Sequence, residues 1–169
     1  MKKLTLLFAV ILCINFAATK VSAQTAPVLS GIDDNSDYYK FAALARSANL
    51  GPTLDALGSY TVLAVPNIIF RNMSPGKLDS LEKNPATVIK AHIIKGKYNK
   101  AAIIKLLTVG KGKATLTNIL GQTLKLTLTK DSKLTITDSK GNTAYFNTFD
   151  LPDPHGVIHG VDNVFVIGK

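Results

Sequence analysis

The chain has 169 residues, a formal net charge of +9, one cysteine and no tryptophan, and 46% of its residues are hydrophobic while 18% are charged. This composition excludes a disordered tail, a disulfide framework and a multi-domain assembly. The single thiol, Cys13, lies in an N-terminal apolar run, so zinc fingers and thiol chemistry are excluded for the folded part of the chain.

The N-terminal segment has the features of a secretory signal peptide. Lys2 and Lys3 precede an apolar run, and the small-residue site Val21-Ser22-Ala23 follows it. The run is shorter than the ~20 apolar residues of a membrane-spanning helix, so a retained anchor is the less favoured alternative. We predict an exported protein, in the periplasm, on the cell surface or in the medium. Its predicted parts are a signal peptide (1–23), a polar segment (24–36) and one folded domain (37–169).

Helical patterns dominate the first half of the predicted domain. Apolar residues at helical spacing follow Tyr38, and Pro52 begins a second short helix that ends at Gly58. Residues that favour helix N-termini predict three further helices. These starts are Ser74-Pro75, Asn84-Pro85 and Asn99. The helix that follows Asn84-Pro85 is expected to reach Ile93.

Strand patterns begin with a run over 60–65 that is apolar almost throughout, which predicts a strand buried on both faces. From Ala114 onward, leucines and Ile136 alternate with threonine and lysine, and this period of two predicts an antiparallel meander with one dry and one wet face. A last apolar run from Val157 to Ile167 is expected to close the sheet. Helices first and hairpins later indicate an α+β domain.

Two sequence boxes near opposite ends of the predicted domain carry a family resemblance. The first is Tyr60-Thr-Val-Leu-Ala-Val-Pro-Asn-Ile-Ile-Phe70, and the second is His155-Gly-Val-Ile-His-Gly-Val-Asp162. Together they resemble the fasciclin-like domain family, here as a single-domain, secreted, bacterial-type member. The resemblance implies a wedge-shaped β-sandwich with several helices in the N-terminal half and an antiparallel meander in the C-terminal half. It also implies an adhesion or binding domain without enzymatic chemistry.

The resemblance also suggests candidate partner-binding residues. In some animal members, a Tyr-His pair and an Asp-Ile pair are linked to integrin recognition, and the corresponding pairs here are Ala91-His92 and Asp150-Leu151. The first pair lacks the aromatic ring, so integrin recognition is not expected. The second pair keeps the charge and an aliphatic neighbour. We take His92, Asp150 and Leu151 as candidates for contact with a partner.

The remaining box residues are interpreted as structural. Asn67 is expected to bond to nearby backbone and set the turn after the first strand, and Phe70 is expected in the core. His159 is predicted to be a neutral histidine at the core edge with Asp162 as its hydrogen-bond acceptor. Gly156 is taken as a turn glycine. A catalytic pair of His159 and Asp162 is a weaker alternative, because no nucleophile lies nearby in the sequence.

Motifs for a metal or a cofactor are not found. His155 and His159 are four residues apart, which on a strand separates their Cα atoms by ~13 Å, too far for one zinc ion without a sharp bend. The sequence holds no Gly-rich phosphate loop, nucleophile elbow or His-Glu-x-x-His motif. We therefore predict no cofactor and no enzymatic activity.

Charge is segregated along the chain. Between Glu82 and Asp131 there are ten lysines and no acid. One interpretation is a basic face for an anionic partner; the other is that the lysines solvate the helices and shield a sheet edge. Under the first interpretation, Lys95, Lys97 and Lys100 are candidate partner-binding residues.

The predicted function is a non-enzymatic secreted domain that recognises extracellular matrix, a cell-surface protein or an anionic polysaccharide. Association with a membrane surface is also compatible with the charge. Nucleic acid is not expected, because the chain is exported and Tyr98 is the only aromatic residue among the lysines. The alternative is a periplasmic carrier of a small apolar ligand or lipid, with a cleft between helices and sheet. An apolar pocket would favour the carrier, and a flat basic surface would favour adhesion.

Overall fold

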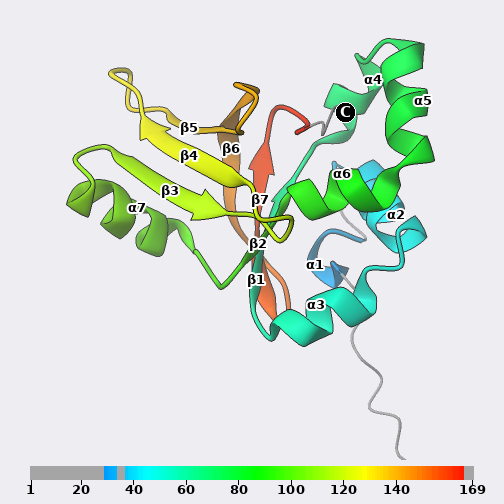
Figure 1. Ribbon diagram of the computed structural model, residues 1–169, viewed down its shortest axis with the longest axis horizontal. Helices are drawn as coiled ribbons and strands as arrows, with labels where there is room; N and C mark the ends of the chain where they lie inside the picture. The colour runs from blue at the N-terminus through cyan, green and yellow to red at the C-terminus, as the bar shows by residue number, and fades with distance from the viewer. Residues whose placement is uncertain (1–28, 34–36, 166–169) are drawn as a thin grey trace, which may run out of the picture.

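The computed structural model describes residues 29–33 and 37–165 (Figure 1). The predicted signal peptide and most of the predicted polar segment lie outside the described residues. Figure 1 shows helices α1 to α6 gathered on one side of the molecule, and most of the sheet together with α7 on the other.

The helices follow the predicted order closely. Gly58 ends α3 with a φ of 69°, and the Asn99 side chain caps α7 by accepting a hydrogen bond from the Ala102 backbone N–H. The prediction that the helix after Asn84-Pro85, which is α6, reaches Ile93 is wrong, because Ile93 begins strand β2. Helices α1 and α4 were not predicted. The bounds are α1 Ser30–Asp33, α2 Tyr39–Ser47, α3 Gly51–Leu57, α4 Asn67–Arg71, α5 Pro75–Lys83, α6 Pro85–Ala91 and α7 Lys100–Val109.

Seven strands form a sheet with the order β2-β1-β7-β6-β5-β4-β3. Strand β7 pairs with β1 in parallel and with β6 antiparallel, and the remaining neighbours are antiparallel. Strand β7, which comes from the last apolar run of the sequence, therefore lies between β1 and β6 in the sheet. The bounds are β1 Tyr60–Ala64, β2 Ile93–Lys95, β3 Lys113–Thr117, β4 Thr123–Leu128, β5 Leu134–Thr137, β6 Thr143–Pro152 and β7 Gly156–Val161.

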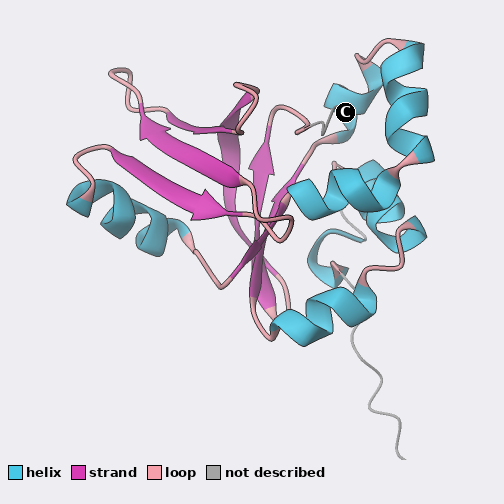
Figure 2. Cartoon of the chain, viewed as in Figure 1, coloured by secondary structure: helices cyan, strands magenta, loops and turns pink. Residues whose placement is uncertain are grey.

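The sheet folds over on itself at the long strand β6. The first part of β6 pairs with β5 and the later part with β7, with register shifts along the strand. At the far ends of the strand order, an isolated bridge between Ile94 and Asn118 joins β2 to the chain just after β3. The two halves of the sheet meet at this bridge and spread apart toward α7 (Figure 2). This is the expected wedge, built from one continuous strand order, and the α+β class is confirmed.

A single apolar core fills the wedge and continues beneath the helices. Leu124 and Leu126 are buried while Lys125 is exposed, so the predicted dry and wet faces are confirmed for β4. In β5 the prediction is wrong, because Thr135 is buried as well as Ile136. Strand β1 is buried at every position, as predicted. Ile32 in α1 is also fully buried, so the packed part of the chain begins before residue 37.

Gly156 is required for close packing and not for a turn. It is the first residue of β7 and pairs with Tyr60 of β1. A Cβ atom at this position would lie 2.6 Å from the Tyr60 ring and from its carbonyl oxygen. The prediction of a turn glycine is wrong, because the residue is needed where two strands approach too closely for a side chain.

Candidate functional site

His92 lies in the core and is not available to a partner. Its side chain is fully buried between the rings of Phe41 and Phe165. Its Nδ1–H donates to the Leu63 carbonyl (2.8 Å), and Nε2 accepts from the Phe165 backbone N–H (2.9 Å). Burial lowers the pKa of His92 to about 4. The prediction of His92 as a contact residue is therefore wrong, since every polar atom of the ring is used inside the fold.

His159 is also fully buried, as a structural histidine should be. Its Nε2–H donates to the Tyr98 carbonyl (2.7 Å), while Nδ1 accepts from the Asp150 backbone N–H (3.2 Å). The ring packs edge-on against Phe146 and Phe149. Burial lowers its pKa, so the neutral form is favoured.

Asp162 is not the partner of His159. Side chains alternate along a strand, so residues three positions apart point to opposite faces. The Asp162 carboxylate instead accepts from the Tyr145 backbone N–H (2.7 Å), at the end of the pairing between β6 and β7. The predicted pairing is wrong, and the alternative catalytic pair of His159 and Asp162 has no geometric basis.

Asp150 and Leu151 lie within strand β6, at one of its register shifts, and not in a loop. Asp150 has a φ of 58°, and its Oδ1 accepts from the Lys100 backbone N–H (2.8 Å) at the start of α7. Leu151 is half-buried and pairs with Ile158 of β7. The Asp150 carboxylate, 44% exposed, thus holds the first turn of α7 while one side stays open to solvent.

The residues of the first box are structural, but Asn67 acts over a longer range than a local turn. Its Oδ1 accepts from the Lys40 backbone N–H (3.0 Å), which satisfies a donor in the first turn of α2. The Asn67 backbone N–H donates to the Asp37 carbonyl. Phe70 is buried in the core, as predicted.

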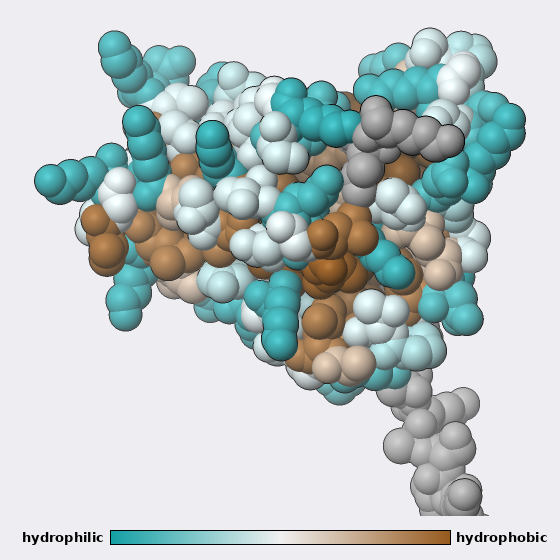
Figure 3. Space-filling view, in the orientation of Figure 1, coloured by the Kyte–Doolittle hydropathy of each residue, from teal (hydrophilic) through white to brown (hydrophobic). Residues whose placement is uncertain are grey.

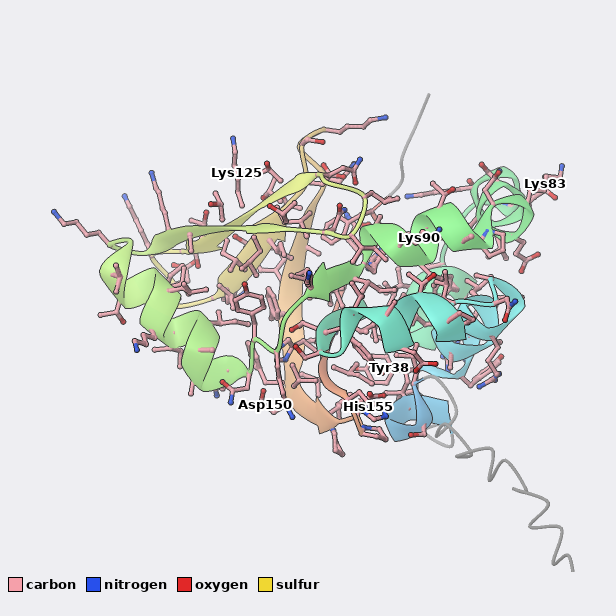
Figure 4. The ribbon with its side chains drawn as sticks, turned by 60° about the horizontal axis from the view of Figure 1, so that its bottom comes forward. Tyr38, Lys83, Lys90, Lys125, Asp150 and His155 are labelled. Carbon is pink, nitrogen blue, oxygen red and sulfur yellow. The ribbon has the colours of Figure 1, made fainter. Side chains whose placement is uncertain are left out.

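The lysines of the acid-free stretch do not share one face. Lys95, Lys97 and Lys100 are exposed around the junction between β2 and α7, and the Lys100 Nζ lies 5.2 Å from the centre of the Phe149 ring. Lys125 lies on the face of β4 opposite to Leu128, which faces α7. In Figure 4, Lys83 and Lys125 lie near the upper edge of the view, whereas Asp150, which bonds to the Lys100 backbone, lies near the lower edge.

A polar surface with a shallow hollow covers the outer side of β3 and β4. Three adjacent cross-strand pairs combine lysine and threonine side chains, and all of these residues are exposed except the half-buried Thr127. We call this surface the lysine–threonine face. Its pairs are Lys113 with Thr127, Thr115 with Lys125, and Thr117 with Thr123.

An apolar groove of about 910 Å³ lies between α7 and the sheet. One wall is formed by the residues of α7 that recur at helical spacing, Ile103, Ile104 and Leu107 among them. The other wall comes from β4, β5 and β6, with Leu128 and Phe149 among its side chains. The alternative prediction expected a cleft between helices and sheet, but it named none of the residues that line this groove. The available signal was the sequence of α7. Its apolar residues Ile103, Ile104, Leu107 and Val109 cover a wider part of the helix surface than the single stripe that packs on the core, so some of them are left exposed.

Within residues 29–33 and 37–165, no group of three or more histidine, cysteine or acidic side chains is placed to hold a metal ion. None of the described helices is long and apolar enough to cross a membrane.

The architecture is that of a small α+β domain in which both buried histidines bond to backbone groups. The family model of the Fasciclin domain matches residues 36–167, and the chain belongs to this family. It is 27% identical over 128 residues to the uncharacterized protein sll1735 of Synechocystis sp., covering 72% of this chain and 84% of that protein.

A solved structure shares the fold. It is a FAS1 domain pair from the insect cell adhesion molecule Fasciclin I, with a TM-score of 0.62 and 17% sequence identity. The similarity covers 77% of this chain and 45% of the insect chain, so the present chain spans less than half of that domain pair. Fasciclin domains are in general associated with adhesion and are in general non-catalytic.

Proposed function

We propose that this protein is an exported, non-enzymatic adhesion domain that binds an anionic polysaccharide through the lysine–threonine face. The observation that carries the proposal is the register of β3 and β4. It places Lys113 and Lys125 on adjacent strands among exposed threonine hydroxyls. Ammonium groups can pair with carboxylate or sulfate groups of a polysaccharide, and hydroxyl groups can donate to or accept from its sugar hydroxyls.

The electrostatics of this face support a negatively charged partner. Among the described residues, neither Lys113 nor Lys125 forms an ion pair. Neither β3 nor β4 contains an acidic residue, so no carboxylate on these two strands neutralises the lysines. Unpaired like charges repel each other and slightly destabilise a fold, and an anionic partner relieves that repulsion.

Export is part of the proposal and is tested separately. The lysine pair, the apolar run and the site Val21-Ser22-Ala23 support cleavage after Ala23. The intact mass of the exported protein should correspond to a chain that begins at Gln24. Retention of residues 1–23 in that protein would contradict the proposal of a cleaved signal peptide.

Binding is tested with heparin and alginate as anionic polysaccharides and with dextran as the neutral one. The variant Lys113→Glu/Lys125→Glu should bind the anionic chains about tenfold more weakly, because two favourable charge contacts become unfavourable. Wild-type affinity should fall as salt shortens the screening length from ~10 Å at 0.1 M. Dextran should bind weakly or not at all.

The matched control is Lys95→Glu/Lys97→Glu, which changes the net charge equally at two other exposed lysines. It should retain most of the affinity, because only long-range attraction is reduced. Equal losses in both variants would show that net charge, and not this face, governs binding. A larger loss in the control would move the site to the junction of β2 and α7, and affinity independent of salt would overturn the proposal.

A further inference from the structure

We infer that the groove between α7 and strands β4 to β6 binds a small amphipathic ligand with an apolar chain and one anionic head group, such as a long-chain carboxylate. This site is separate from the lysine–threonine face, because Leu128 in its wall and Lys125 in that face point to opposite sides of β4. The inference therefore does not depend on the proposed adhesive function.

The walls of the groove expose several large apolar side chains close together. Ile104 is 52% exposed, Leu128 47% and Tyr145 43%, and all three line the groove. Figure 3 shows hydrophobic side chains gathered at the α7 end of the molecule, between strongly hydrophilic ones. Covering these side chains with an apolar chain would remove their surface from water, which is the main driving force for such binding.

The size and lining of the groove suit a small molecule. Its volume of about 910 Å³ lies within the usual range for ligand sites, ~300–1,000 Å³. Ile103 and Leu107, both buried, contribute to it from α7. The polar side chains of the lining are two aliphatic hydroxyls, Thr108 and Ser132, and the charged groups of Lys100, Lys133 and Asp162, with the Tyr145 hydroxyl beside them. The lining is otherwise dominated by aliphatic and aromatic groups, which favour an acyl or similar chain.

The charge at the rim determines the head group. Lys100 lies over the Phe149 ring and Lys133 over the Tyr145 ring, with Nζ 5.2 Å and 5.9 Å from the ring centres. Neither lysine forms an ion pair among the described residues. Each ammonium can turn to an incoming anion while its stem still covers the ring.

Two carboxylates lie near these lysines, and both already accept backbone hydrogen bonds. Asp162 is the acidic residue of the lining, and its Oδ1 accepts from the Tyr145 backbone N–H. Asp150, outside the lining, accepts from the Lys100 backbone N–H. The lining itself thus holds two ammonium groups and one carboxylate, and a carboxylate head group can pair with those ammonium groups.

The test uses cis-parinaric acid as a fluorescent probe with the purified exported protein. The chain contains no tryptophan, so the probe emission has no tryptophan background. The probe, kept below its micellar concentration, should bind saturably at one site per chain. Palmitate should displace it better than hexadecanol, which has the same chain length without the charge.

Two pairs of substitutions separate the apolar walls from the rim. Ile104→Asn/Leu128→Asn should weaken probe binding about tenfold, since both side chains are half-exposed and lose apolar contact without opening the core. Lys100→Gln/Lys133→Gln should remove the preference for palmitate over hexadecanol. The matched control Lys113→Gln/Lys125→Gln, on the opposite face, should bind the probe like the wild type.

Several outcomes would overturn the inference. The first is the absence of saturable binding, and the second is an unchanged affinity in Ile104→Asn/Leu128→Asn. The third is a preference for palmitate over hexadecanol in Lys100→Gln/Lys133→Gln that is as large as in the wild type. Thermal melting of each variant shows whether a lost signal comes from unfolding, and a variant that melts early is replaced by Leu128→Gln alone. Binding to phosphatidylcholine vesicles without binding to monomeric probe would identify a membrane-contacting surface instead of a ligand groove.

Discussion

At the scale of single residues, the two buried histidines share one design. In each ring, one nitrogen donates to a backbone carbonyl and the other accepts from a backbone N–H. The neutral ring satisfies both partners. In the protonated ring both nitrogens carry a hydrogen, so one ring N–H would still donate to the carbonyl but the other would point at a backbone N–H. His92 joins β1 to the C-terminal residues of the domain, and His159 joins β6 to the segment before α7.

The first prediction concerns acid stability. The pKa of His92 is about 4 in the folded chain because of burial, and about 6.5 in the unfolded chain. The unfolded state therefore binds more protons in this interval, so stability is complete above pH ~6.5 and is lost as pH falls toward ~4. The lowered pKa of His159 acts in the same direction.

Urea unfolding at several pH values measures this effect. In the wild type, the free energy of unfolding should fall by a few kcal/mol between pH 7 and 4. His92→Gln should be less stable at pH 7 and should show a flatter dependence on pH. A pH dependence as steep in this variant as in the wild type would assign the effect to other groups.

The second prediction separates His159 from Asp162. His159→Ala should cost about 2–4 kcal/mol, because it leaves a cavity and strands the Tyr98 carbonyl and the Asp150 N–H. Asp162→Ala removes one bond at an exposed strand end and should cost about 1 kcal/mol or less. The double variant should show additive losses, since the two side chains share no bond. A coupling energy above about 1 kcal/mol would restore the predicted pairing.

Residue identity in the sequence was a good guide to burial but not to partners. Phe70 and His159 are placed in the interior by their apolar surroundings in the chain. The partners of Asn67 and Asp162 depend on which backbone groups the strands leave unpaired, and that follows only from the register. His92 was assigned to the surface through the family resemblance, although its apolar neighbours Ile93 and Ile94 indicated burial.

At the scale of elements, α7 packs on the core through Ile103 and Leu107, and hydrogen bonds fix its first turn. The Asn99 side chain accepts from the Ala102 N–H, and Asp150 accepts from the Lys100 N–H across the molecule. The carboxylate also lies at the positive end of the helix dipole. The position of α7, and thus the width of the groove, depends on a cap from β6 that no local pattern in the sequence reveals.

The third prediction tests this cap. Asp150→Gly accommodates the φ of 58° but removes the carboxylate, so amide exchange in the first turn of α7 should speed up about five- to tenfold. Asp150→Asn is the control, because it tolerates the same backbone conformation and keeps an acceptor oxygen. Hydrogen exchange resolved by residue provides the measurement. Unchanged exchange in Asp150→Gly would show that Asn99 alone holds the turn.

The helices and strands that could not be predicted from the sequence are short. Strand β2 has three residues and α4 has five, which is too few for a period of 2 or 3.6 to show. The longer alternation of the meander and the Pro-marked helix starts were predictable, because each is encoded within one segment.

At the scale of the whole molecule, the class of the fold follows from the order of its elements, but the sheet topology does not. The parallel pairing of β1 with β7 brings together segments at opposite ends of the domain. Closure of the wedge requires a further long-range contact, made by Asn118 where β3 ends beside β2. Such contacts have no signature in local periodicity.

The last prediction concerns this closure. Asn118 is 3% exposed; its Nδ2 donates to the Ala91 carbonyl and to Gln122 Oε1, and its Oδ1 accepts from the Leu120 and Gln122 N–H groups. Asn118→Ala leaves these backbone groups without partners and should cost about 2–4 kcal/mol, measured by urea unfolding. Exchange should rise at the edges of β2 and β3 first.

Asn163→Ala is the control, because that half-buried side chain also bonds to backbone, donating to the Thr143 carbonyl, but lies away from the bridge. It should cost about 1 kcal/mol or less. If both variants lose the same stability, or if exchange at β2 and β3 does not change in Asn118→Ala, the two halves of the wedge are held together by their shared core and not by the bond network at its closed end.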